Sequence, residues 1–202
     1  MPFLCNSTSL TDYLADSDIA DYHHPAVQSL GAELRQQAPD ETAFIRLAFE
    51  YVRDQISHSW DIQSSRITCS ASDVLAHKEG ICYAKSNLLC AILRSQGIPA
   101  GYCYQRLTLG DTPDTGYVIH ALNAVYLPAA ERWIRLDARG NKPGIDAQFS
   151  LDQERLAFPI RKEYDEVDYP IIYSEPHPST IQVLRQHNDC KVMYLHGLPA
   201  EL

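Results

Sequence analysis

The chain has 202 residues, and its 17 basic and 26 acidic side chains give a net charge of −9 with neutral histidines. A net negative chain presents no broad phosphate-binding surface, which argues against nucleic acid as a partner. No stretch approaches the roughly 18–20 apolar residues that cross a bilayer, so no membrane association is expected. The first residues carry no basic segment followed by an apolar one, so the sequence predicts no secretory signal and a cytoplasmic location.

Four helices are predicted in the first half of the chain, over residues 25–37, 40–56, 73–78 and 82–96. Pro25 suits a first helical turn, and Asp40 is a good N-cap for the second helix. Gly80 ends the third helix. The fourth is apolar on nearly every side, as is typical of a helix at the centre of a fold. It ends at Gly97, and Pro99 prevents its continuation.

The second half of the chain begins with three predicted strands, over residues 100–109, 117–127 and 132–138. Their content of Val, Ile and Tyr favours β-structure. A turn over 110–116 joins the first two strands, and residues 128–131 form a short hairpin connection. Beyond Gly140 the pattern weakens. The sequence there predicts an extended surface segment over 159–180, with a solvated acidic stretch at 163–168 and a last helix over 179–188.

The cysteines are not spaced for a metal or a redox pair. None of the six forms a Cys-x-x-Cys motif, which argues against a zinc ribbon or a thioredoxin-like site. Their even number allows three disulfides, but a chain of this size without an export signal is expected to keep free thiols. No metal or other cofactor is expected. The six are Cys5, Cys69, Cys82, Cys90, Cys103 and Cys190.

Three residues stand where catalytic groups would be useful. Cys82 opens the predicted central helix, His120 lies in the second predicted strand, and Asp137 ends the third. A thiol, an imidazole and a carboxylate in this arrangement are typical of a nucleophile, its base and the group that orients the base. The positive end of a helix dipole and a neighbouring imidazolium would both favour a thiolate at Cys82. The unpaired amides of the first helical turn could hold an oxyanion.

The predicted hairpin places His120 and Asp137 on one face of the sheet. If Leu127 pairs with Arg132, paired positions sum to 259, so Asp137 lies opposite Leu122 and diagonal to His120. A register shifted by two residues, with a sum of 257, would place His120 and Asp137 directly opposite each other. Both registers keep the two side chains on one face, because side chains alternate with a period of two. Either one leaves them within reach of a hydrogen bond.

The motifs around these residues resemble the transglutaminase-like superfamily. The match covers roughly residues 40–140 and is carried by 52–56 (VRDQI), 71–75 (ASDVL), 80–86 (GICYAKS), 93–100 (LRSQGIPA), 120–126 (HALNAVY) and 133–137 (WIRLD). The resemblance implies an α+β, papain-like fold in which a central helix bearing Cys82 packs on an antiparallel sheet bearing His120 and Asp137. We expect a single domain over 1–202, with its core at 40–140 and an extension at 141–202.

The sequence departs from the usual family pattern near the presumed site. Leu122 replaces an aromatic residue that often follows the histidine, and Ala124 replaces a common glutamate. Ala138 and Arg139 stand where the family usually has Pro-Thr. None of these positions belongs to the triad, and all of them bear on the choice of substrate.

The resemblance implies thiol chemistry on amide or acyl groups, with Cys82, His120 and Asp137 as nucleophile, base and orienting residue. The expected activity is hydrolysis of amide or peptide bonds through a thioester. The alternatives are a protein-glutamine transglutaminase or other acyltransferase, and a non-catalytic binding scaffold. The substrate is expected to be a peptide or protein, entering between loop 110–116 and segment 159–178. His58 and Trp60 are the candidates for a side-chain oxyanion donor, and the oligomeric state is open.

Overall fold

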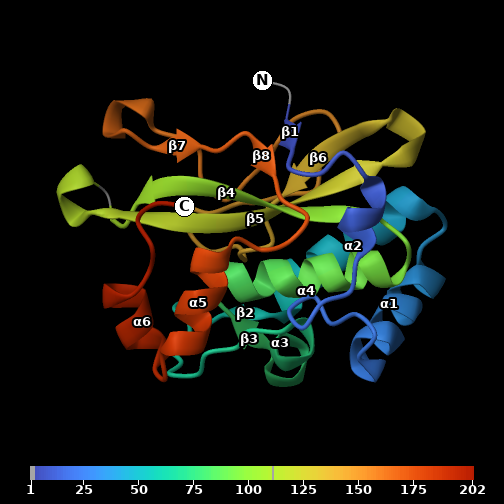
Figure 1. Cartoon of the computed structure of the whole chain (residues 1–202), viewed down its shortest axis with the longest axis horizontal. Coiled ribbons are helices and arrows are strands. Elements are labelled where there is room, and N and C mark those ends of the chain that lie inside the picture. The colour runs from blue at the N-terminus through green and yellow to red at the C-terminus, as the bar shows by residue number, and fades with distance from the viewer. Residues whose placement is uncertain (1–2, 111) are drawn as a thin grey trace.

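A buried helix packed against a four-stranded sheet forms the centre of the molecule (Figure 1). The structure is a computed structural model that describes residues 3–110 and 112–202, so Asp111 of the predicted turn lies outside the described residues. The helix is α4 (Cys82–Ser95). The sheet is antiparallel, in the order β6-β5-β4-β7. Its strands are β4 (Ala100–Thr108), β5 (Tyr117–Leu127), β6 (Arg132–Leu136) and β7 (Val167–Asp168).

Three helices cover α4 on the side away from the sheet. They are α1 (Pro25–Gln37), α2 (Glu41–Gln55) and α3 (Ala71–His77), and all three contact α4. Asp40 caps α2 as predicted, because its carboxylate accepts a 2.8 Å hydrogen bond from the amide of Ala43. Because these helices enclose α4, its residues from Tyr83 to Arg94 are all buried, as the sequence predicted for a central helix. The prediction of an α+β fold with a cysteine-bearing helix on an antiparallel sheet is confirmed.

Short elements complete the chain. β1 (Leu4–Cys5) pairs in parallel with β8 (Ile171–Ile172), and β2 (Ser57–His58) pairs in parallel with β3 (Glu79–Gly80). The predicted last helix is α5 (Pro178–Gln186), but a further helix, α6 (Cys190–His196), follows it. Single 3-10 turns lie at Leu10–Leu14, Pro113–Thr115, Pro128–Ala130 and Lys162–Tyr164.

The β5–β6 hairpin has the first of the two predicted registers. Leu127 pairs with Arg132 and Asn123 with Leu136, so the paired positions sum to 259. Strand β6 ends at Leu136, two residues before the predicted end, and Asp137 follows directly after it. The 3-10 turn at Pro128–Ala130 closes the hairpin and so fixes this register.

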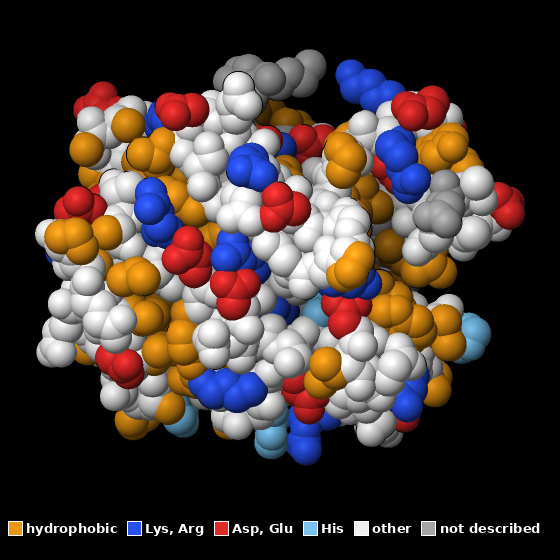
Figure 2. Space-filling model, turned by 180° about the vertical axis from the view of Figure 1, so that it is seen from behind, with side chains coloured by type: hydrophobic (Ala, Val, Ile, Leu, Met, Phe, Trp, Pro, Cys, Tyr) orange, Lys and Arg blue, Asp and Glu red, His pale blue; other side chains and the backbone are white. Residues whose placement is uncertain are grey.

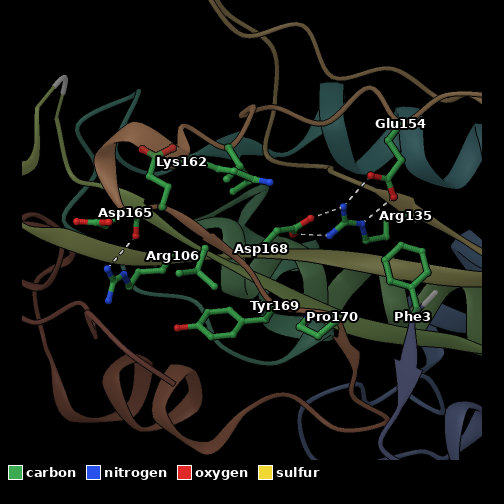
Figure 3. A pocket seen from close by; sticks show the side chains of 12 residues that line it. Phe3, Arg106, Arg135, Glu154, Lys162, Asp165, Asp168, Tyr169 and Pro170 are labelled. Atoms are coloured by element: carbon green, nitrogen blue, oxygen red, sulfur yellow. Dashed lines mark hydrogen bonds and ion pairs between the residues drawn. The ribbon is translucent and has the colours of Figure 1, made fainter. Parts of the chain in front are cut away.

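The expectation of a solvated acidic stretch at 163–168 is wrong for two of its members. Glu166 is buried and accepts hydrogen bonds from the amides of Arg161 and Thr108, at 2.8 and 3.1 Å. Asp168 lies on β7 and pairs with Arg135, whose guanidinium also pairs with Glu154 (Figure 3). A carboxylate can be buried here because an arginine or backbone amides hold each one.

All six cysteines are free thiols, as expected for a chain without disulfides. Within the described part of the chain, no helix combines the length and the apolar character needed to cross a membrane. On the face shown in Figure 2, acidic and basic side chains are interspersed with apolar ones, and neither sign of charge forms a large patch.

Candidate active site

Cys82 is the first residue of α4 and lies at the one end of this helix that is not fully buried. The N-cap residue is Ile81, and no side chain of the described chain caps this end by a hydrogen bond. The first amides of α4 therefore keep free N–H groups beside the thiol. Gly80 is needed before it, because a Cβ at this position would lie 3.0 Å from both Ala84 Cβ and Thr68 Oγ1.

His120 and Asp137 form a direct side-chain pair. The distance from His120 Nε2 to Asp137 Oδ2 is 2.8 Å, and the two residues are only 4 % and 1 % exposed. The Phe158 ring stands edge-on to the imidazole, with the ring centroids 5.0 Å apart. The aromatic edge and the burial together keep water away from this hydrogen bond.

Backbone amides complete the environment of Asp137. Oδ2 also accepts a 3.0 Å hydrogen bond from the amide of Ala157, and Oδ1 accepts one of 3.2 Å from the amide of Arg139. Both carboxylate oxygens are thus used, which holds the carboxyl plane fixed relative to the imidazole. The amide of Ala157 comes from the extension beyond residue 140, so the extension takes part in building the pair.

The charges in this group support one another. Burial lowers the pKa of His120, but the charges of Asp137 and Cys82 and hydrogen bonds with both raise it to about 10. Burial raises the pKa of Asp137, but the charge and hydrogen bond of His120 and the two backbone amides bring it below its ordinary value. The contribution of Cys82 to the His120 pKa places the thiol next to the imidazole, so the structure brings the three predicted residues together.

The three residues open into a cleft of about 560 Å³. Cys82 and His120 line it, together with Gly110 and Pro159 from the two segments that the sequence predicted at the entrance. A third wall was not predicted. It comes from α6, whose Tyr194 lines the cleft and stacks on Trp60 with ring centroids 4.2 Å apart.

An ion-paired cluster forms the floor of the cleft on the side of residue 139. The Asp61 carboxylate binds both guanidinium nitrogens of Arg139, and Lys142 Nζ lies 2.7 Å from Asp61 Oδ1. Arg139 is only 5 % exposed and lines the cleft. The sequence flagged Arg139 as a departure from the family pattern but gave no sign of its partner, which lies 78 positions earlier.

Sequence reasoning also missed Lys85, which is 1 % exposed and lies one helical turn after Cys82. Its ammonium donates to the carbonyls of Ile56 and Arg53, at the end of α2. It also lies 3.4 Å from the place of a Cβ at Gly140, which has a φ of +111°. Lys85 therefore links α2, the cysteine-bearing helix and the loop after Asp137. Only its proximity to Cys82 in sequence could have drawn attention to it.

Replacing Lys85 by methionine is expected to remove a pH dependence of stability. Burial, helped by the charge of Arg139, lowers the pKa of Lys85 to about 7 in the folded protein, against about 10.4 in the unfolded chain. Between these values the unfolded state binds more protons, so this group makes the protein more stable as pH rises, by ~1.4 kcal/mol per unit of pKa shift at most.

Urea unfolding of both proteins at pH 6, 8 and 9.5 measures this contribution. The free energy of unfolding of the wild type should rise relative to that of Lys85→Met as pH increases. The difference isolates Lys85, because His120 titrates in both proteins. A difference that stays constant over this range would contradict a depressed lysine pKa.

No group of three or more His, Cys, Asp or Glu side chains in the described part of the chain is arranged to hold a metal ion. The chemistry available at the cleft is therefore that of the side chains themselves: a thiol at a helix N-terminus, an imidazole beside it, and a buried carboxylate behind the imidazole.

Residues 28–138, more than half of the chain, match the family model of the transglutaminase-like superfamily. The chain belongs to this superfamily, which confirms the resemblance seen in its motifs. The superfamily comprises cysteine-dependent hydrolases and acyltransferases. A comparison with curated protein sequences finds no match.

Solved structures show the same fold. A candidate cysteine protease from Cytophaga hutchinsonii is 19 % identical with a TM-score of 0.53, over 66 % of this chain and 43 % of that one. The periplasmic domain of TgpA from Pseudomonas aeruginosa is 17 % identical with a TM-score of 0.48, over 65 % of this chain and 48 % of that one. A TGase is 17 % identical with a TM-score of 0.42, over 91 % and 52 %. The chain thus spans about half, or less, of the length of each.

Proposed function

We propose that the protein is a thiol hydrolase of amide or peptide bonds, in which Cys82 is the nucleophile, His120 the base and acid, and Asp137 the orienting residue. One observation carries the proposal: the buried 2.8 Å His120–Asp137 pair and the Cys82 thiol share one cleft, with the free amides of α4 beside the sulfur. A buried carboxylate behind an imidazole has a clear use in this chemistry, because it fixes the ring and stabilises its cationic form.

The reaction begins with the proton on His120 and the sulfur as thiolate. The raised pKa of His120 means that the ring carries this proton at neutral pH. The sulfur of Cys82 attacks the substrate carbonyl, and the new C–S bond gives a tetrahedral oxyanion. The C–N bond then breaks, and the leaving amine takes the proton from His120.

Formation of the thioester helps this proton to leave. The thiolate is one of the two charges that raise the pKa of His120, and it becomes neutral when sulfur is acylated. The ring then holds its proton less tightly and ends the first half-reaction as a neutral base. It takes a proton from water, the hydroxide oxygen attacks the thioester, and breakage of the C–S bond returns the thiolate and the imidazolium.

Transfer to an amine shares every step up to the thioester, so the acceptor decides between hydrolase and transferase. We favour hydrolysis of a peptide or protein substrate, and the transferase is the second outcome of the test below. A scaffold without activity is disfavoured, because a catalytically silent chain has no need of a buried imidazole–carboxylate pair beside a free thiol.

Selective alkylation of Cys82 is the expected sign of an activated thiol. Incubation with iodoacetamide at pH 6, followed by peptide mapping, should label Cys82 ahead of Cys5, although Cys5 is the exposed cysteine. The selectivity should disappear in His120→Ala, because the thiolate loses its counter-ion. Equal labelling of the two thiols in the wild type would contradict an activated nucleophile.

A glutamine peptide, offered with and without a primary amine, separates the two activities. Release of ammonia without incorporation of the amine identifies the hydrolase, and incorporation identifies the transferase. If neither product forms from glutamine or backbone amides while Cys82 is selectively alkylated, the nucleophile stands and the amide substrate class is wrong.

A further inference from the structure

His58 lies beside the thiol because of the β2–β3 pairing. In this short parallel ladder His58 is the partner of Gly80, two residues before Cys82, and the amide of Ser59 donates to the Gly80 carbonyl at 3.2 Å. The imidazole lines the same cleft as Cys82 and His120. The chain segment that turns into α4 therefore carries this second histidine with it.

The ring nitrogens of His58 lack partners in the described structure. The residue is only 6 % exposed, and Nδ1 is buried without a hydrogen bond. Nε2 has no hydrogen bond within residues 3–110 and 112–202 either, but it is not among the buried unpaired atoms, so it faces the cleft. A buried polar atom without a partner is uncommon in folded proteins, which singles out this ring.

The surroundings keep this imidazole neutral. Burial lowers its pKa well below the ordinary value, and the charges of Arg139, Lys85 and His120 act in the same direction against the weaker opposing effect of Asp61. A neutral ring carries one proton. We assign it to Nε2, because a buried N–H without a partner costs more than a buried lone pair without one.

We propose that His58 is a further catalytic residue, whose Nε2–H donates to the oxyanion that forms when Cys82 attacks the carbonyl, beside the free amides of α4. This role rests on the proposed function. It gives the unpartnered ring a ligand that exists only during the reaction, and a donor that meets the charge only in the transition state raises kcat rather than binding. A neutral imidazole also donates without losing its proton to the intermediate.

Trp60, the other candidate from the sequence, serves as a wall instead. Its indole is stacked face to face on Tyr194, with an interplanar angle of 11°. Tyr194 in turn stands edge-on to His58, with centroids 6.3 Å apart. The stack therefore fixes the orientation of the His58 ring, and the structure assigns the donor role to the histidine.

The test compares three variants with the wild type. His58→Phe keeps the ring and removes the N–H, His58→Gln keeps a side-chain N–H, and Trp60→Phe is the matched control that keeps the aromatic wall. We expect His58→Phe to lower kcat by ~10²–10³-fold with KM within about threefold, a loss typical of one oxyanion donor. His58→Gln should recover at least about tenfold of this, and Trp60→Phe should stay within about threefold of the wild type.

Two further measurements keep the proposal separate from the triad. The rate of Cys82 alkylation by iodoacetamide should be the same in His58→Phe and wild type, because no oxyanion forms. Binding of the peptide aldehyde acetyl-Leu-Leu-norleucinal, which adds to the thiol as a tetrahedral adduct, should weaken in His58→Phe by at least about tenfold. This binding needs no turnover, so it tests His58 even if the amide substrate is wrongly chosen.

The result that overturns the proposal is a His58→Phe variant with unchanged kcat or unchanged aldehyde affinity. An equal loss of alkylation and of activity also overturns it, because it would make His58 a structural support for the thiol. If instead the wild type shows no selective alkylation of Cys82, the proposed function itself fails, and that outcome is distinct from either.

Discussion

Cys82→Ala is expected to remove measurable amide hydrolysis, a fall of at least ~10⁴-fold in kcat/KM. Without the sulfur no thioester can form, and nothing else in the cleft can replace it as a nucleophile held against His120. The first amides of α4 and the cleft walls remain, so substrate binding should persist while the chemical step is lost. The variant therefore separates binding from chemistry.

The comparison is made against Cys69→Ala. Cys69 is also a free, half-buried thiol, but it does not line the cleft. Its removal should leave kcat/KM within about twofold, since buried-surface effects of one small side chain act on stability rather than on a remote site. Both variants should unfold in thermal scans within a few degrees of the wild type, as expected for ~1 kcal/mol in a chain of this size. Activity above a tenth of the wild-type value in Cys82→Ala would show that the thiol is not the nucleophile.

The loss of the thiolate should also be visible at His120. Its raised pKa depends on the charges of both Asp137 and Cys82. In Cys82→Ala only the carboxylate remains, so the imidazole pKa, followed by NMR, should fall below its wild-type value. Asp137→Asn removes the other contribution, and the two effects together account for the protonated resting state of the ring.

Local sequence signals were sufficient for the elements that carry the triad. Asp40 begins α2, Gly97 follows the end of α4, and the four-residue connection before Arg132 sets the hairpin register. Each of these depends on capping, turn chemistry or alternation, which act over a few residues. The relation between His120 and Asp137 follows from the hairpin register alone, which is why the sequence could place them on one face.

The parts of the site that sequence reasoning missed are held by distant contacts. The amide that completes Asp137 comes from Ala157, and the partner of Arg139 is Asp61. Neither partner lies in a segment with a periodic pattern. The same is true of α6, a seven-residue helix whose hydrophobic spacing is too short to predict, although its Tyr194 walls the cleft.

His58 and Lys85 illustrate a second limit. Both are polar residues that are almost fully buried beside the thiol, and their types alone favour exposure or a chance core position. Their roles depend on what surrounds them: the carbonyls at the end of α2 for Lys85, and the absence of a partner within the described chain for the ring of His58. Such information belongs to the packed structure and has no signature in a single sequence.

Asp137→Asn is expected to reduce both activity and stability, because the carboxamide cannot satisfy the hydrogen bonds at this position. Oδ2 accepts from His120 and the amide of Ala157, and Oδ1 accepts from the amide of Arg139. An NH₂ group in either place meets at least one backbone N–H donor. A buried backbone N–H left without a partner costs ~1–3 kcal/mol, and the loss of the anion behind the imidazole should lower kcat/KM by ~10²–10⁴-fold.

The pH dependence identifies the cause of the instability. The pKa of Asp137 is lowered by folding, so its contribution is present above the unfolded value of about 3.9 and is lost as pH falls through the folded pKa. The pKa of His120 is raised to about 10, so its contribution is complete below about 6.5 and is lost as pH rises toward 10. The wild type should therefore exceed Asp137→Asn in free energy of unfolding by most between about pH 4.5 and 6.5, and by less on either side.

Urea titrations of the two proteins from pH 3 to pH 10 give this difference directly. Asp54→Asn is the matched control: Asp54 is 44 % exposed at its side chain and pairs with Arg53 on the surface, so its replacement should change stability by less than ~1 kcal/mol and leave kcat/KM intact. A flat difference between wild type and Asp137→Asn would mean that the amide merely disturbs packing. A maximum in the stated window, with the loss of activity, ties the stability of this loop to the same ion pair that the chemistry requires.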